Sequence, residues 1–244
     1  MDSDSLLKRR ISDIAELAEK YQTPRFSDFL DEAEQVIAGE VAFGGKWYGG
    51  YPGAGRKIVG FFPDWYETEY DEFPISCVRI IKKGSRELSH RDYLGTLMSL
   101  GLDRKKIGDI AVVEDGAYVF AAEEVAGHIA GSIEKIANCG VKLSIIPLSD
   151  AKIPEPEFEY REIVAAGMRL DAVLAAYCNF SRKSASDFIA SGRIGVNHKE
   201  VMRNDYTLKE GDLLSIRGFG RACIEKIGGN TRSGRLHITV KKFI

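Results

Sequence analysis

Basic and short polar residues gather in the stretch from Met168 to Arg221, and their chemistry is that of phosphate binding. Ser181 is placed to cap a helix whose first turn holds Arg182 and Lys183. Cations are not what the dipole favours at a helix N-terminus, so this placement costs a little stability and indicates a use outside folding. Backbone N–H groups at such an end can hold a phosphate, and the two cations would add to the same site.

A second group of cations lies between residues 79 and 106, where eight basic residues stand against three acidic ones. The segment is either a second patch that faces a polyanion or a solvated rim of loop and helix. The basic residues are Arg79, Lys82, Lys83, Arg86, Arg91, Arg104, Lys105 and Lys106.

The sequence shows no catalytic or metal-binding pattern. His90 and Asp92 flank Arg91, but residues one or two apart on a helix do not share a face. No serine or cysteine nucleophile sits in a recognisable elbow. The 4 cysteines form no CxxC motif, and the 4 histidines have no metal-ligand spacing. We therefore expect no catalytic residue, no metal and no cofactor.

The glycine-rich segment 41–66 interleaves aromatic residues with Lys46, Arg56 and Lys57. Such a segment could cradle phosphate through backbone N–H groups. It lacks GxxxxGK[ST], and it lacks GxGxxG between a strand and a helix. We favour a loop or hairpin that uses glycine for positive φ, with strands at Val41–Phe43 and Ile58–Phe62.

Periodicity predicts the elements that must position these groups. Amphipathic helices are expected at Leu6–Tyr21 and Phe26–Ile37, the second capped by Ser27 or Thr23. From Ile75 on, the pattern becomes strand, helix, two strands around Asp115-Gly116, helix and strand. The expected ranges are 75–83, 90–101, 109–114, 117–122, 123–140 and 141–147, and Ser89 is expected to cap the helix at 90–101.

The order βαββαβ predicts a ferredoxin-like (RRM-like) middle domain in an α+β protein. Tyr118 and Phe120 lie on one face of its third strand and are expected in the core rather than as base-stacking residues. Prolines at 147, 154 and 156 mark a linker, because proline removes donors and clashes in helices. The expected parts are 1–72 (N-terminal helices and glycine/aromatic-rich segment), 73–147 (middle domain), 148–158 (linker) and 159–244 (C-terminal α+β domain).

Charge is divided unevenly along the chain. From Arg161 onward there are 15 Lys+Arg against 8 Asp+Glu, a net charge of +7. The remainder carries 19 basic and 28 acidic residues, a net charge of −9. This split predicts that the C-terminal third meets a polyanion, unless the surface charge is merely uneven. No apolar run or signal-peptide pattern is present, so we expect a cytoplasmic protein without membrane contact.

Two segments resemble a known family. SHRDYLGTLMSLGLDRKKIGDI, residues Ser89 to Ile110, resembles the central segment of the YlmH family of bacterial RNA-binding proteins. The C-terminal third resembles the S-four-type RNA-binding domain that this family carries, followed by RGFGR. The matching positions are Arg169, Leu170, Asp171, Ser181, Arg182, Gly192, Arg193, Val196, Asn197, Gly211, Asp212 and Ile216.

The resemblance implies a helical pair on a small sheet, with RNA bound across the pair and the adjacent turn. An internal ion pair between Arg169 and Asp171 is expected to hold the fold. The cations between residues 79 and 106 become a second RNA patch. The implied RNA contacts are Ser181, Arg182, Lys183, Arg193, Asn197, His198, Lys199, Arg217 and Arg221.

The leading hypothesis is a monomeric, non-catalytic binder of structured RNA. The family resemblance implies rRNA or tRNA on the ribosomal large subunit, in translation quality control or rescue of stalled ribosomes, with an indirect link to cell division. One alternative is an RNA-modifying enzyme, a pseudouridine synthase or rRNA methyltransferase with an appended RNA-binding domain, although no further catalytic signature is visible. Another is a protein-interaction adaptor that uses the acidic N-terminal part.

Overall fold

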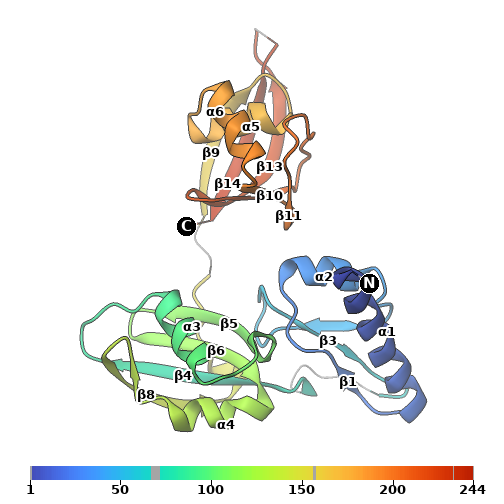
Figure 1. Ribbon diagram of the computed structural model, residues 1–244, viewed down its shortest axis with the longest axis vertical. Coiled ribbons are helices and arrows are strands. Elements are labelled where there is room, and N and C mark those ends of the chain that lie inside the picture. Colours follow the sequence, from blue (N-terminus) through green and yellow to red (C-terminus); the bar gives the residue numbers. More distant parts are fainter. Residues whose placement is uncertain (1, 67–71, 156–157, 233, 244) are drawn as a thin grey trace. The chain divides into compact units, whose positions relative to one another are not determined.

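The computed structural model describes residues 2–66, 72–155, 158–232 and 234–243. It is a mixed α/β structure in two compact units, Met1–Pro154 and Glu155–Ile244, both drawn in Figure 1. Pro156 and Glu157 of the expected linker lie outside the described residues. The finer division at residues 72 and 147 stays a proposal.

The first unit begins with helices and a small sheet. Its sheet has the strand order β1-β3-β2. Leu6–Tyr21 is confirmed as helical, since a helix starts after the cap Asp2 and continues to Tyr21. The elements are α1 (Ser3–Tyr21), β1 (Arg25–Phe26), α2 (Glu32–Gly39), β2 (Lys46–Tyr48) and β3 (Ile58–Phe61).

Two predictions in this region are wrong. The helix expected at Phe26–Ile37 begins only at Glu32, where Asp31 forms a capping box with Glu34. Residues 25–26 are instead extended and pair with β3, and Ser27 accepts a hydrogen bond from the Val59 N–H (3.0 Å). The strand expected at Val41–Phe43 is absent, and Lys46–Tyr48 pairs with β3 in its place.

A five-stranded antiparallel sheet forms the rest of the first unit, with the order β5-β6-β4-β8-β7. One face packs on α3 and α4 through Tyr93, Leu97 and Ile129. Tyr118 and Phe120 lie in the core on the other face, as expected. The elements are β4 (Ile75–Lys83), α3 (His90–Ser99), a 3₁₀ turn (Arg104–Lys106), β5 (Ile107–Val113), β6 (Gly116–Ala122), α4 (Glu123–Ser132), β7 (Lys135–Ile136), β8 (Cys139–Ile146) and a 3₁₀ turn (Leu148–Asp150).

The helix predicted for residues 123–140 is too long. α4 ends at Ser132, and Lys135–Ile136 pairs back onto Cys139–Gly140. Ala137 and Asn138 connect these strands with positive φ angles of 43° and 65°, the backbone that a two-residue hairpin requires. By contrast, Ser89 caps α3 as predicted.

The glycine-rich segment is held tightly against the five-stranded sheet. Gly50 has a φ of 100°, and a Cβ there would lie 2.3 Å from the Phe120 ring. Asp109 of β5 accepts hydrogen bonds from the hydroxyl of Tyr51 (2.9 Å) and from the N–H groups of Gly55 (2.6 Å) and Arg56 (3.1 Å). These donors face a protein carboxylate, which favours the structural interpretation of the segment over a nucleotide site.

The second unit carries a six-stranded antiparallel sheet, ordered β11-β10-β12-β13-β14-β9. Helices α5 and α6 lie side by side on one face of it (Figure 1). The strand β9 starts at the end of the predicted linker and was not anticipated. The elements are β9 (Phe158–Ala165), α5 (Leu170–Cys178), α6 (Arg182–Ala190), β10 (Ile194–Val196), β11 (Lys199–Glu200), β12 (Leu213–Ile216), β13 (Gly220–Asn230) and β14 (Leu236–Phe243).

We expect Asp109→Ala to destabilise the first unit, because three partly buried donors lose their acceptor. The loss should be roughly 1–3 kcal/mol, or a decrease in Tm of about 3–10 °C. A thermal melt followed by circular dichroism measures it. Asp13→Ala, at an exposed position of α1, is the control and should leave Tm unchanged. An equal Tm for both variants would contradict the structural role of Asp109.

Candidate RNA interface

The helix pair of the second unit places two cations at one exposed end. Asn179 ends α5 in the left-handed conformation, and Ser181 then caps α6 by accepting from the Ser184 N–H (3.0 Å). Arg182 and Lys183 follow in the first turn and are exposed. The apolar side of the same helix packs into the core, so the two cations are fixed on the opposite side.

A buried carboxylate positions one of these cations. Asp171 is 7% exposed and binds Arg169 through two contacts (3.1 and 3.3 Å), which confirms the predicted internal ion pair. Its Oδ2 also lies 3.4 Å from Nη1 of Arg182. Arg182 is therefore partly engaged within the protein, whereas Lys183 is its exposed neighbour.

The β10–β11 hairpin presents the next predicted contacts. Asn197 and His198 form its turn with positive φ angles of 48° and 65°. The Asn197 amide donates to Asp212 (2.8 Å) and accepts from the Leu213 N–H (2.9 Å). Asn197 thus fixes the turn to the loop before β12, and Lys199 beside it is exposed. Asn197 was predicted only as an RNA contact, but its side chain also positions the turn.

Sequence reasoning missed an aromatic cluster at the end of α6. The rings of Phe180, Phe188 and Phe219 have centroids 5.3–6.5 Å apart, and Phe219 meets the other two edge to face. Phe219 is 39% exposed, and the Arg193 guanidinium lies 4.4 Å from the Phe188 centroid. The signal was present as an aromatic between two glycines, Gly218 and Gly220.

Two predicted cations share a shallow groove of about 440 Å³. Arg193 and Arg217 line it together with Gly195, Ser215 and Gly220. Arg221 lies farther along β13, and its guanidinium is 5.1 Å from the Phe243 ring. The second unit therefore gathers its predicted residues at the start of α6, around the β10–β11 turn and in this groove.

The second predicted patch is divided by the fold. Arg79 is 7% exposed, lies over the Tyr118 ring (4.6 Å) and binds Asp115 (2.5 Å). It is a buried structural residue, which corrects its placement on an exposed patch. Arg104 donates to the carbonyls of Ile107 and Gly108 and is half-buried.

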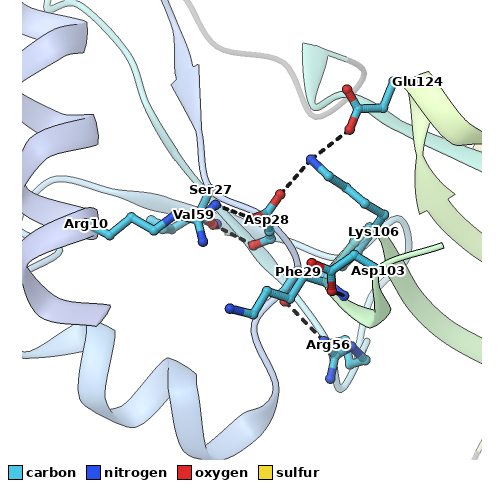
Figure 2. Close-up of polar contacts among 10 residues, drawn as sticks. Arg10, Ser27, Asp28, Phe29, Arg56, Val59, Asp103, Lys106 and Glu124 are labelled. Atoms are coloured by element: carbon cyan, nitrogen blue, oxygen red, sulfur yellow. Dashed lines mark hydrogen bonds and ion pairs between the residues drawn. The ribbon is translucent and has the colours of Figure 1, made fainter. Parts of the chain in front are cut away.

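Lys106 is also engaged inside the protein. Its ammonium lies between Asp28 (2.7 Å) and Glu124 (2.7 Å), as Figure 2 shows. Arg10 of α1 contacts the same Asp28 carboxylate. Of the remaining cations, Lys82 is half-buried, and the exposed ones are Lys83, Arg86, Arg91 and Lys105. The prediction of a second patch is therefore limited to these four cations.

Comparisons with known proteins match two separate segments of the chain to family models. Residues 69–150 match a family model described as "Putative RNA-binding domain in YlmH", and residues 168–214 match the S4 domain, the S-four-type domain expected above. A curated Bacillus subtilis (strain 168) protein named "Ribosome-associated protein quality control protein P2" is 35% identical over 224 residues, which cover 89% of this chain and 87% of that protein. The chain belongs to the YlmH family.

A solved structure has a similar fold. It is named "Cell division protein ylmH from Streptococcus pneumoniae" and is 21% identical, with a TM-score of 0.52 over 63% of this chain and 96% of that one. At this identity the likeness shows the fold alone. The cations at α6 and the β10–β11 turn lie within the S4 match, whereas Arg217 and Arg221 lie beyond its end.

Clustered metal-binding side chains and membrane-spanning helices are both absent from the described part of this YlmH-family chain. No group of three or more His, Cys, Asp or Glu side chains in it could hold a metal ion. None of its helices is long and apolar enough to cross a membrane.

The contacts of Asp28 predict a pH dependence of stability. Burial alone would raise the pKa of Asp28, but the hydrogen bond from Lys106 and the charges of Arg10 and Lys106 outweigh it and lower the pKa. A lowered folded-state pKa stabilises the fold above the unfolded-state pKa, and this stabilisation is lost as the pH falls through the folded value. Asp28→Asn should therefore cost roughly 1–3 kcal/mol at pH 7.

Denaturant titrations at pH 7 and at pH 3 measure this effect. The difference in unfolding free energy between wild type and Asp28→Asn should shrink at pH 3. Asp13→Asn, at an exposed position, should show little difference at either pH. A difference for Asp28→Asn that does not change with pH would show that its charge is not what stabilises the contact.

Proposed function

We propose that this protein is a ribosome-associated, non-catalytic binder of structured RNA. The observation that carries the proposal is the exposed group of cations at the start of α6 and at the β10–β11 turn, held in place by Asp171 and by the Asn197–Asp212 pair. Phosphate contacts are expected to dominate, because side chains read duplex RNA poorly through its deep groove. The family models and the name of the B. subtilis relative support this role.

The finer parts of the proposal rest on the resemblance to the YlmH family. The RNA would be rRNA or tRNA on the large ribosomal subunit, and the process would be quality control or rescue of stalled ribosomes. The S. pneumoniae neighbour is named a cell division protein, which motivates an indirect link to that process. We propose a cytoplasmic monomer. The proposed RNA contacts within the S4 match are Ser181, Arg182, Lys183, Arg193, Asn197, His198 and Lys199, and those beyond its end are Arg217 and Arg221.

The middle of the first unit is proposed to be a ferredoxin-like domain. The order β8-β4-β6-β5, antiparallel throughout, and the packing of α3 and α4 on one face support it. The part of the opposite face around Tyr118 and Phe120 is packed against the N-terminal segment through Phe29 and Ile58, so these two rings are not available to stack RNA bases. Any RNA contact of this domain would come from Lys83, Arg86, Arg91 and Lys105 at its surface.

Charge reversal at Lys183 and Lys199 tests the interface. Both lysines are exposed, whereas a reversed Arg182 would also set a carboxylate beside buried Asp171. Lys183→Glu/Lys199→Glu should weaken binding to large ribosomal subunits at least tenfold, and the slope of log affinity against log salt should fall by roughly 1–2. Cosedimentation with separated subunits over a salt series measures both.

Arg232→Glu/Arg235→Glu is the matched control, because it makes the same change in charge at two exposed arginines between β13 and β14. It should retain nearly wild-type binding. Unchanged binding of the double variant, or binding that ignores salt, would move the RNA site away from the helix pair.

The proposal of a non-catalytic role has its own test. Incubation of the full chain with S-adenosylmethionine and rRNA should give no methyl transfer, and mass spectrometry of the rRNA should show no new pseudouridine. Turnover in either assay would favour the RNA-modifying alternative.

A further inference from the structure

The sheet of the second unit has a face turned away from α5 and α6. Ala222, Ile224, Val240 and Ile163 are buried in the core beneath the helices. Their neighbours along each strand point to the other side, because side chains alternate across a strand. This outer face is built mainly from β13, β14 and β9.

Strand register places the outer-face residues in two rows. Arg221 pairs with Ser215 on one side, and the register of β13 and β14 sets it opposite Phe243, which pairs with Phe158. In the next row, Cys223 pairs with Lys241, which pairs with Tyr160. We name Phe158, Tyr160, Arg221, Lys241 and Phe243 the sheet platform.

Aromatic rings and cations alternate on the platform and hold one another. Phe158 and Phe243 meet edge to face at 5.2 Å. The Lys241 ammonium lies 3.9 Å from the Phe158 centroid, and the Arg221 guanidinium lies 5.1 Å from that of Phe243. Tyr160 is 58% exposed. The platform therefore presents an exposed ring beside two cations that contacts with other rings hold in place.

Its chemistry matches unpaired nucleotides. Exposed rings on a sheet stack bases, and neighbouring cations bind the phosphates between them. A duplex hides its base faces and would meet only the cations. The platform also continues into the groove of Arg193 and Arg217, because Ser215 both lines that groove and pairs with Arg221. One strand of RNA could therefore follow groove and platform together.

We propose that the sheet platform is a second nucleic-acid site, which binds single-stranded RNA by stacking on Tyr160 and phosphate contacts to Lys241 and Arg221. Its residues all lie outside the segment 168–214 that matches the S4 domain. The site differs from the helix-pair interface in its ligand, since it takes unpaired bases where the helix pair takes structured RNA. It does not depend on the proposed ribosomal role.

Fluorescence anisotropy with two labelled RNAs tests the platform in the full chain. One probe is a short oligouridylate, and the other is a fully paired RNA hairpin. Tyr160→Ala/Lys241→Gln should bind the oligouridylate about tenfold more weakly and the hairpin within twofold of wild type. Lys183→Glu/Lys199→Glu should show the reverse preference. Tyr21→Ala/Lys152→Gln, which removes an exposed tyrosine and lysine of the first unit, is the matched control.

Cys223 reports where the oligouridylate binds. It is partly exposed beside Lys241, whereas Cys77, Cys139 and Cys178 are buried. Bound oligouridylate should slow alkylation of Cys223 by N-ethylmaleimide in the wild type but not in the platform variant. Thermal melts of Tyr160→Ala/Lys241→Gln and of the control Tyr21→Ala/Lys152→Gln should match the wild type, because the altered side chains lie outside the core.

Two results would overturn the proposal. Either the wild type fails to bind oligouridylate, or the Tyr160→Ala/Lys241→Gln variant binds it unchanged. If that variant binds oligouridylate unchanged and also loses ribosome cosedimentation, the face is a protein-docking surface instead. Loss of hairpin binding in the Lys183→Glu/Lys199→Glu variant bears on the helix-pair interface alone, so the two proposals fail separately.

Discussion

Carboxylates that the fold has partly removed from water hold both units in their shape. A buried charge is costly unless hydrogen bonds or opposite charges compensate it, so each such group fixes the segments that donate to it. Asp109 joins the glycine-rich segment to β5, and Asp28 joins α1 to the turn before β5. Asp171 and Asp212 do the same for the helix pair and the β10–β11 turn. Asp171 thus positions Arg182, and Asp212 positions the turn that precedes Lys199.

The same constraint divides the basic residues into two kinds. Arg79, Arg104 and Lys106 bind carbonyls and carboxylates of the protein itself. Lys183 and Lys199 remain exposed. Net charge along the chain cannot separate the two kinds, because both contribute equally to it. The two kinds differ in whether a carbonyl or carboxylate of the protein binds the cation. For this reason, the segment 79–106 exposes fewer cations than its composition suggests.

Local signals in the sequence were sufficient where one element carried its own start and end. Ser89 capped α3, Ser181 capped α6, and Asn197-His198 formed the expected turn. Prediction failed where a distant partner decided the outcome. Phe26 and the segment 135–136 follow a helical period, yet both are extended because a neighbouring strand pairs with them. Of the candidate site, residue types and their clustering were predictable. The burial of Arg79, the role of Asn197 and the Phe219 cluster depend on tertiary packing and were not.

The place of β14 between β13 and β9 has a consequence for how the second unit is made. A ribosome releases β9 first and β14 last, so the first strand of the unit must wait for its partner until Leu236–Phe243 has left the exit tunnel. Pairing between strands this far apart in sequence is slow, because the chain loses the entropy of closing a long loop before the stabilising contacts form. The helix pair can pack earlier on β10 and β12, which share its core and are released before β14. During synthesis, therefore, the end of the unit that is proposed to bind phosphate should take shape before the outer sheet face exists.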